Sequence, residues 1–278
     1  MRKPTVWLTM GGVPRPIAEN TLRGVWVRRA RHPKLMKWAP MDSSHAERPL
    51  TPATLEAIRQ FDTCTVANAI ETLGLRLRNE GYTNPGLRCV TGGSERIIGY
   101  AATSRVKTSN PPVSGTSYYD RWDWRAVMES MLVPRIAVIQ DIDERPGLGS
   151  VAGEVHAAIL QAQHCAGLIT NGAVRDVPGL TALGFPVYAC HVTVSHGYCH
   201  WVDFGQSVQV SGLGVASGDL LLADCHGVLS IPREGATDLP RIAAEISSKE
   251  RRLIDLCKSP EFTVDKLRAA IREIDKPK

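Results

Sequence analysis

The residue types best suited to chemistry in this chain are an adjacent arginine and aspartate, Arg175 and Asp176, and a glutamate that precedes them, Glu154. One carboxylate, with water and substrate in the other positions, commonly binds Mg²⁺, so Asp176 is a candidate metal ligand. Glu154 could hold and orient metal-bound waters. The planar guanidinium of Arg175 could bind keto or carboxylate oxygens and stabilise negative charge that develops there. An Arg-Asp pair is also a common exposed salt bridge, and that simpler interpretation stays open.

Glu154 lies in a segment whose pattern predicts a helix that begins at Gly153. Its apolar residues follow the spacing of three and four that places side chains on one helical face. These residues are Val155, Ala158, Ile159 and Ala162. The first N–H groups of a helix lack partners within it and lie at the positive end of its dipole, so they can anchor a substrate carboxylate. The groups concerned belong to Gly153, Glu154, Val155 and His156.

Arg175 and Asp176 are predicted to lie just beyond the carboxyl end of a buried strand. Residues 167–170, GLIT, form a short apolar run of strand type, and Asn171-Gly172 is a turn signal. In open α/β sheets, ligands bind at the edge where the strands end. The pattern therefore places the arginine and the aspartate where a ligand would bind.

A longer run, GEVHAAILQAQHCAGLITNGAVRDVPGLTALGFPVYA, contains these features in order and resembles the RraA-like family. The resemblance is carried by the Gly-acid pair, the Arg-Asp pair about twenty residues later, and the GFPV segment that follows. The family includes metal-dependent 4-hydroxy-4-methyl-2-oxoglutarate and 4-carboxy-4-hydroxy-2-oxoadipate aldolases, and the ribonuclease regulators named RraA. The resemblance implies an α/β fold, with a single RraA-like domain whose central β-sheet is flanked by helices in the swivelling β/β/α arrangement.

The resemblance also implies a homotrimer or homohexamer whose active sites lie between subunits. The segment FDTCTVANAIETLG is similar to the family's N-terminal helix, from which the aldolases present an acid to the neighbouring subunit's site. Asn68 stands in the place of that acid, which removes a negative charge and a possible proton acceptor. Glu250, in a predicted tail helix, is the nearest match to a glutamate that family members present to the adjoining subunit.

Three segments follow from these patterns. Residues 1–50 are predicted to form an irregular basic extension, in which positions 1–40 hold nine lysines or arginines and one acid. Residues 51–236 are predicted to form the RraA-like catalytic domain, and residues 237–278 are predicted to form C-terminal helices that pack on the domain or on a neighbouring subunit. The extension has the arginine content of a transit peptide but not the serine enrichment, and a translation start at Met41 is an alternative.

Within the domain, local signals predict where several elements begin and end. Thr51 precedes a proline and predicts a helix start, and a second helix is predicted from near Asp62 to Gly74. A third predicted helix turns Trp124 towards the core. Asp141, at the end of a predicted strand, is expected to be solvated. The predicted strands cover residues 97–106, 135–141 and 185–189.

Composition favours a cytoplasmic protein without a membrane or nucleic-acid partner. The chain has 278 residues, of which 43% are hydrophobic, and its size suits one α/β domain with an appendage. The net charge is +5, but beyond position 40 acidic residues outnumber basic ones by 27 to 24, so a general nucleic-acid surface is not indicated. No apolar run reaches the roughly 18 residues that a membrane-spanning helix needs. Seven widely spaced cysteines favour a reducing compartment over a disulfide framework.

One stretch gathers cysteines and histidines, which are the ligands of tetrahedral zinc sites. They are Cys190, His191, His196, Cys199 and His200. Zinc sites usually pair two blocks of closely spaced ligands, and this single stretch has no second block. Ordinary polar packing is therefore favoured over a zinc site, and a histidine in a pocket wall is a further alternative.

Cleavage of a carbon–carbon bond beside a 2-keto group requires something to hold the electrons of the departing enolate, either a Schiff-base lysine or a divalent metal. No lysine occurs between Gly149 and Leu183, so the sequence favours Mg²⁺ or Mn²⁺. The predicted reaction is retro-aldol release of pyruvate from a 4-hydroxy-2-oxo acid, with oxaloacetate decarboxylation through the same enolate. The alternatives are a non-catalytic regulator resembling RraA and another metal-enolate reaction on a keto acid. A methyltransferase is disfavoured because the nucleotide-binding glycine loop is missing.

Overall fold

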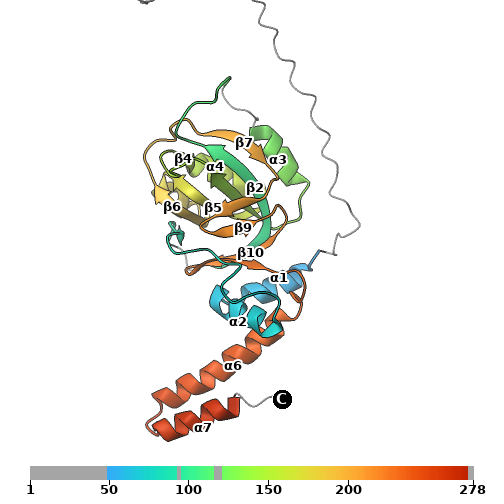
Figure 1. Cartoon of the computed structure of the whole chain (residues 1–278), viewed down its shortest axis with the longest axis vertical. Helices are drawn as coiled ribbons and strands as arrows, with labels where there is room; N and C mark the ends of the chain where they lie inside the picture. Colours follow the sequence, from blue (N-terminus) through green and yellow to red (C-terminus); the bar gives the residue numbers. More distant parts are fainter. Residues whose placement is uncertain (1–48, 93–94, 116–120, 275–278) are drawn as a thin grey trace, which may run out of the picture. The chain divides into compact units, whose positions relative to one another are not determined.

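The computed structural model describes residues 49–92, 95–115 and 121–274 (Figure 1). Nearly all of the extension predicted at 1–50 lies outside the described residues. The helices are α1 (Pro52–Arg59), α2 (Thr63–Leu73), α3 (Arg121–Glu129), α4 (Glu154–Ala162), α5 (Val177–Ala182), α6 (Leu239–Lys258) and α7 (Val264–Ile274). The strands are β1 (Arg88–Cys89), β2 (Ile97–Lys107), β3 (Arg135–Asp141), β4 (Ser150–Ala152), β5 (Cys165–Val174), β6 (Val187–Val192), β7 (His200–Phe204), β8 (Val208–Val210), β9 (Leu213–Val215), β10 (Leu220–Asp224) and β11 (Gly227–Ile231).

A mixed sheet forms the centre of this domain, in the order β1-β6-β5-β3-β2-β10-β11. β4 pairs with β5, and β7 pairs with β2. The pairs β2-β3, β3-β5, β4-β5 and β5-β6 are parallel, whereas β10 is antiparallel to both β2 and β11. The sheet is nearly closed, and helices flank it (Figure 1). The α/β class and the flanked central sheet that the sequence predicts are therefore confirmed.

The sequences of the central strands are nearly continuous runs of apolar residues, because other elements pack on both faces of the sheet there. All but one of the seven residues of β3 are buried, and so are the first eight residues of β2. Ala101 of β2 lies opposite Ile136 of β3, and Val138 of β3 lies opposite Ile169 of β5. The pairing with β3 reaches Thr170, and β5 continues beyond it to Val174, where the candidate site residues Arg175 and Asp176 follow.

α1 begins, and α2 begins and ends, where the sequence predicts, for identifiable reasons. The Thr51 hydroxyl accepts a hydrogen bond from the Thr54 N–H (3.1 Å) at the start of α1, and the Asp62 carboxylate accepts one from the Thr65 N–H (2.7 Å) at the start of α2. α2 ends at Gly74, whose φ of +65° is the left-handed conformation that glycine adopts without a steric penalty. These caps fix the start of α2, which carries Asn68.

The core consists of three clusters of buried side chains on the sheet. One holds α3, α4 and α5 against the sheet and includes Trp124, as predicted. The second packs α1, α2 and the start of α6 against β10, β11 and the amino-terminal part of β2. The third lies under the β8-β9 hairpin. α7 buries none of its side chains. No helix within the described ranges is both long enough and apolar enough to cross a bilayer.

The structure corrects the prediction of which face of α4 is buried. Ala157 and Leu160 pack in the core, whereas Val155 is 75% exposed and Ala162 is exposed. Ala158 and Ile159 are half-buried. The helix is apolar around most of its circumference, so a second stripe at a spacing of three competes with the predicted one. The exposed stripe lies directly beside Glu154.

A second correction concerns Asn171 and Gly172, which form no turn. They lie inside β5, because the Asn171 side chain replaces a strand partner: it accepts from the Asp141 N–H and donates to the Asp141 carbonyl, both at 2.8 Å. The register of β5 against β6 shifts between Thr170 and Ala173, which is a β-bulge of the kind often found beside functional sites. The strand therefore continues to Val174 and delivers Arg175 directly.

Candidate functional site

The two halves of the candidate site meet where β4 and β5 end. These parallel strands bring Ala152 opposite Val174, and the Arg175 N–H donates to the Ala152 carbonyl (3.0 Å). Gly153 and Glu154 follow β4, and Arg175 and Asp176 follow β5. The backbone pairing therefore places side by side two segments that are about twenty residues apart in sequence. The structure brings together the glutamate, the arginine and the aspartate that the sequence singles out.

Direct contacts join these residues. The Asp176 carboxylate accepts from the Glu154 N–H (3.3 Å) and lies 3.5 Å from the Arg175 Nε. Both side chains are partly open to solvent, Arg175 at 37% and Asp176 at 42%. Among the described residues, no group accepts a hydrogen bond from the two terminal nitrogens of Arg175. The Nε of Arg175 thus forms the salt bridge with Asp176, and the edge of the guanidinium that carries the two terminal nitrogens can bind a ligand.

At the start of α4, one backbone N–H group already donates a hydrogen bond to a carboxylate of the protein. Of the four N–H groups predicted to anchor a substrate, that of Glu154 donates to Asp176. The His156 side chain turns inwards: its Nδ1 lies 3.3 Å from the Val151 carbonyl oxygen, and its ring contacts Trp124 and Trp201 edge-on. His156 can therefore contact a ligand at this helix end only through its backbone N–H group, and not through its side chain.

Two glycines leave room for the two carboxylates, and no signal in the sequence indicated the second of these glycines. A Cβ on Gly153 would lie 3.2 Å from Cγ of Asp176, with a carboxylate oxygen closer still. A Cβ on Gly179, in α5, would lie 2.6 Å from Cδ of Glu154. Each carboxylate thus occupies the space that a side chain would fill on the opposite segment. Two carboxylates with solvent-facing oxygens suit a hard divalent cation such as Mg²⁺ or Mn²⁺.

Asp176 has a backbone conformation that is uncommon for a residue with a side chain. It is the N-cap of α5, with φ 58° and ψ 36°, in the left-handed region. Asp and Asn tolerate this region better than most residues, and such backbone outliers cluster at functional sites. The conformation directs the carboxylate back over Gly153.

Asp141 differs from its prediction. Its carboxylate is buried, at 1% exposure, and accepts from the N–H groups of Gly147 (3.0 Å) and Asp143 (3.1 Å). Burial raises the pKa of Asp141. Asp141 is therefore not the solvated acid that the sequence predicts. Its buried carboxylate instead holds the loop that leads to β4.

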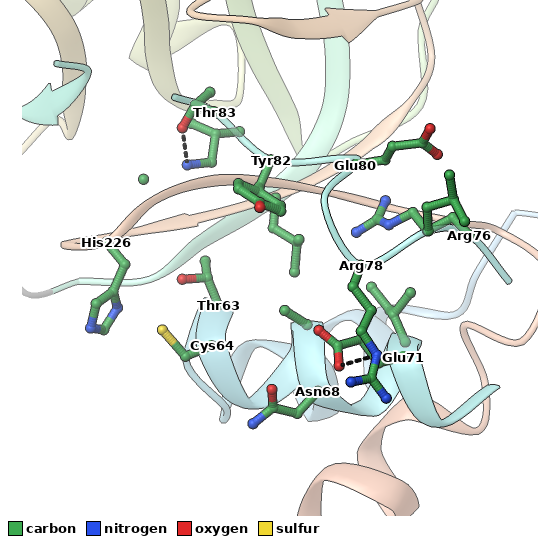
Figure 2. Close-up of a pocket in the computed structure, with 16 residues that line it drawn as sticks. Thr63, Cys64, Asn68, Glu71, Arg76, Arg78, Glu80, Tyr82, Thr83 and His226 are labelled. Carbon is green, nitrogen blue, oxygen red and sulfur yellow. Dashed lines mark hydrogen bonds and ion pairs between the residues drawn. The ribbon is translucent and has the colours of Figure 1, made fainter. Parts of the chain in front are cut away.

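Asn68 and Glu250 make no contact with Glu154, Arg175 or Asp176 within the described part of one chain. Asn68 lies on α2 and lines a separate cavity of about 360 Å³, together with Glu71, Tyr82 and His226 (Figure 2). Glu250 is exposed on α6. Contributions of these two residues to a neighbouring subunit's site stay a prediction.

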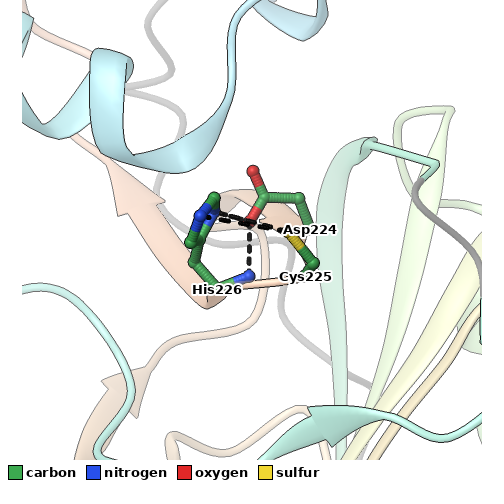
Figure 3. Close-up of side chains that lie close together, drawn as sticks. All are labelled: Asp224, Cys225 and His226. Atoms are coloured by element: carbon green, nitrogen blue, oxygen red, sulfur yellow. Dashed lines mark hydrogen bonds and ion pairs between the residues drawn. The ribbon is translucent and has the colours of Figure 1, made fainter.

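The five cysteines and histidines between positions 190 and 200 are spread over β6, a loop and β7. Burial raises the pKa of the Cys199 thiol to about 12, and His200 is buried with its Nδ1 at 2.7 Å from the Tyr198 carbonyl oxygen. Within the described ranges, a group of three close potential metal ligands occurs instead at Asp224, Cys225 and His226 (Figure 3). No spacing of ligand residues in the sequence indicated that group.

Known proteins share both sequence and fold with this chain. A family model described as RraA-like (Aldolase/RraA) matches residues 63–230. A protein of Halalkalibacterium halodurans, named "Putative 4-hydroxy-4-methyl-2-oxoglutarate aldolase", is 23% identical over 150 residues, which is 52% of this chain and 71% of that protein.

Two solved structures have a similar fold. One is an uncharacterized protein from Pseudomonas syringae pv. tomato, at 19% identity and a TM-score of 0.62, covering 80% of this chain and 95% of that one. The other is RraAS2 from Streptomyces coelicolor, described as an unusual member of the RNase ES inhibitor RraA protein family. It is 20% identical with a TM-score of 0.58, covering 74% of this chain and 96% of that one. At these identities, the likeness concerns the fold alone.

Proposed function

The chain belongs to the RraA-like family, and on that premise we propose that it is a divalent-metal-dependent carbon–carbon lyase acting on a small 2-keto acid. The reaction is retro-aldol cleavage of a 4-hydroxy-2-oxo acid to pyruvate, with oxaloacetate decarboxylation through the same enolate. One observation supports this proposal above the others. At the ends of two paired strands, the Asp176 carboxylate lies 3.5 Å from the Arg175 Nε and accepts from the Glu154 N–H, and the Asp176 and Glu154 carboxylates each occupy the space beside a glycine of the opposite segment.

In this proposal, Asp176 would be the direct ligand of Mg²⁺ or Mn²⁺, and Glu154 would hold the ion's waters in place. The cation would polarise the keto oxygen of the substrate. The open edge of Arg175 binds the keto or carboxylate oxygens and stabilises the negative charge that grows on them. The backbone N–H groups at the start of α4 that remain open, with Gly153 beside them, hold the substrate carboxylate.

The proposal includes a neighbouring copy of the chain. The exposed apolar stripe of α4, which begins at Val155 beside Glu154, is the kind of surface that another subunit covers. A homotrimer or homohexamer would place Asn68 and Glu250 of one copy near the site of another, and would close that site from solvent.

A binding function without catalysis is the second candidate, and Asn68 favours it. The amide replaces the acid expected at this position of α2, so the site would lack one proton acceptor. In such a protein the Arg175-Asp176 pair would be structural. The two candidates make opposite predictions about turnover.

The first experiment measures pyruvate release from oxaloacetate and from 4-hydroxy-4-methyl-2-oxoglutarate, with Mg²⁺ or Mn²⁺ and again with EDTA. We expect release with the metal and its loss with EDTA, because the enolate needs a positive charge beside it. Equal release with and without the chelator would exclude the metal mechanism. If a folded protein releases no pyruvate from either compound, the binding function is preferred.

Gly179→Ala tests whether the reaction depends on the position of the Glu154 carboxylate, which lies against Gly179. Alanine suits a helix better than glycine, by about 1 kcal/mol, so the thermal midpoint should not fall. The new methyl group would displace the Glu154 carboxylate, and we expect metal-dependent release to fall by about 10–100-fold, as when a group that orients metal ligands is lost.

Gly214→Ala is the matched control, since nothing lies within 4 Å of the position of its Cβ. It should keep full activity. Unchanged activity in Gly179→Ala would show that the position of the Glu154 carboxylate does not matter for the reaction.

A further inference from the structure

β5, which delivers the arginine and the aspartate of the candidate site, changes its neighbour shortly before it ends. It pairs with β3 as far as Thr170 and with β4 from Ala173 onwards, and Asn171 lies between the two pairings. β4 has only three residues, and on its other edge the Ser150 N–H donates to the Ser195 carbonyl (2.8 Å). The position of so short a strand beside β5 therefore depends on further contacts.

Asn171 replaces the missing backbone pairing with its side chain. Its Oδ1 accepts from the Asp141 N–H and its Nδ2 donates to the Asp141 carbonyl, both at 2.8 Å. Asp141 is the last residue of β3, so the amide bonds the end of that strand to β5. A Cβ on Gly172 would lie 3.0 Å from the Asp141 Cβ, which shows how closely the two strands approach at this point.

The Asp141 carboxylate extends this connection towards β4. It is 1% exposed and accepts from the N–H groups of Asp143 (3.1 Å) and Gly147 (3.0 Å), which lie in the loop that leads to β4. The Thr108 hydroxyl donates to this carboxylate or to that of Asp143, at 3.2 Å in each case. It also accepts from the Gly149 N–H (3.1 Å), immediately before β4 begins. Hydrogen bonds thus link β5, through Asp141, to the loop that sets the start of β4.

We propose that Asn171 is a positioning residue for the candidate metal site: by holding Asp141 between β5 and this loop, it sets the spacing of the Glu154 and Asp176 carboxylates. The two carboxylates follow different strands, so a shift of either strand changes the distance between them. Metal and catalytic sites tolerate displacements of only about 0.5 Å. The inference rests on the proposed lyase function, because it concerns the metal site of that function.

The chemistry of the amide explains why this residue type suits the position. A primary amide can accept from a backbone N–H and donate to a backbone carbonyl at the same time. Aspartate in place of Asn171 would have no donor for the Asp141 carbonyl, and alanine would leave both backbone groups of Asp141 without this partner. Asn171→Asp and Asn171→Ala therefore remove one and both of the bonds.

Mn²⁺ binding to the full chain, followed by the electron paramagnetic resonance of the free ion, tests the position of the carboxylates without turnover. Each variant is measured well below its thermal midpoint, so that the chain is folded. We expect Asn171→Asp and Asn171→Ala to bind Mn²⁺ about 10–100-fold more weakly than the unmodified chain, as when an outer partner of a metal ligand is lost.

Two controls separate this effect from a loss of stability. Ile242→Val removes a buried methyl group from a different core cluster from the one that contains Ala152 and Val174. It should lower the thermal midpoint and keep the Mn²⁺ affinity. Asn110→Ala removes an exposed amide that donates to the Ser109 hydroxyl, and should change neither quantity. A lower thermal midpoint with unchanged Mn²⁺ affinity in Asn171→Ala would overturn the proposal.

Hydrogen exchange tests the same connection without a metal. The amides of residues 149–154 should exchange about tenfold faster in Asn171→Ala, because two hydrogen bonds that hold their loop are lost. Ile242→Val should leave their rates close to those of the unmodified chain. If the unmodified chain binds no Mn²⁺, the lyase function is refuted, and faster exchange would still show that Asn171 holds β4 in place. Unchanged exchange in Asn171→Ala would overturn the positioning role in either case.

Discussion

Asp176→Asn is expected to lower metal-dependent pyruvate release by about 10³-fold or more while the chain stays folded. A metal ion stabilises the transition state by several kcal/mol, and each 1.36 kcal/mol corresponds to about tenfold in rate. Asparagine tolerates the left-handed backbone at this position (φ 58°) and keeps an acceptor for the Glu154 N–H. The amide loses only the charge that binds the cation.

The measurement is pyruvate release across a range of Mg²⁺ concentrations, with circular dichroism as the check on folding. Asp265→Asn is the control, because Asp265 forms an exposed ion pair with Arg268 on α7. It should keep normal activity. Release by Asp176→Asn at the level of the unmodified protein would remove Asp176 from the metal site.

Arg175→Lys is expected to lower pyruvate release by about 10²–10³-fold, the range seen when a preorganised donor to a developing oxyanion is removed. The guanidinium uses its Nε towards Asp176 (3.5 Å) and has its terminal nitrogens open to a ligand. An ammonium group is a single point of charge and cannot make both contacts in the same plane. Folding should change little, because the Arg175 side chain is 37% exposed.

Arg241→Lys provides the matched control, since Arg241 pairs with Glu245 on the surface of α6. Steady-state kinetics should show a fall in kcat for Arg175→Lys, with Arg241→Lys unaffected. If Arg175→Lys retained full kcat and KM, the arginine would be only the salt-bridge partner of Asp176.

Much of the fold follows from local sequence signals. The caps at Thr51 and Asp62 set the starts of α1 and α2, and the glycine at position 74 sets the end of α2, as predicted, because each satisfies backbone groups near it in sequence. β3 occupies the predicted range 135–141. Such signals act within a few residues and need no knowledge of the tertiary structure.

Other features depend on contacts between distant segments, and the sequence could not supply them. The buried face of α4 was mispredicted because two apolar stripes compete on that helix, and only its packing on the sheet decides between them. Asn171 reads as a turn residue, but its amide completes the hydrogen bonding of Asp141 on a neighbouring strand. Its role depends on which strand lies beside it.

The candidate site shows the same division. Residue types and spacing, together with the resemblance to the RraA-like family, singled out Glu154, Arg175 and Asp176, which the structure brings together. The contact of the Glu154 carboxylate with Gly179 could not be predicted from the sequence, because it depends on how α5 packs against α4.

The left-handed backbone at Asp176 also limits how this position can change during evolution. Most side chains would strain the start of α5, so the residues that fit well are aspartate, asparagine and glycine. Only the first of these carries a charge. A relative could therefore lose the proposed lyase activity and keep its fold through a single replacement of this aspartate. Asparagine or glycine at this position should mark such an inactive relative.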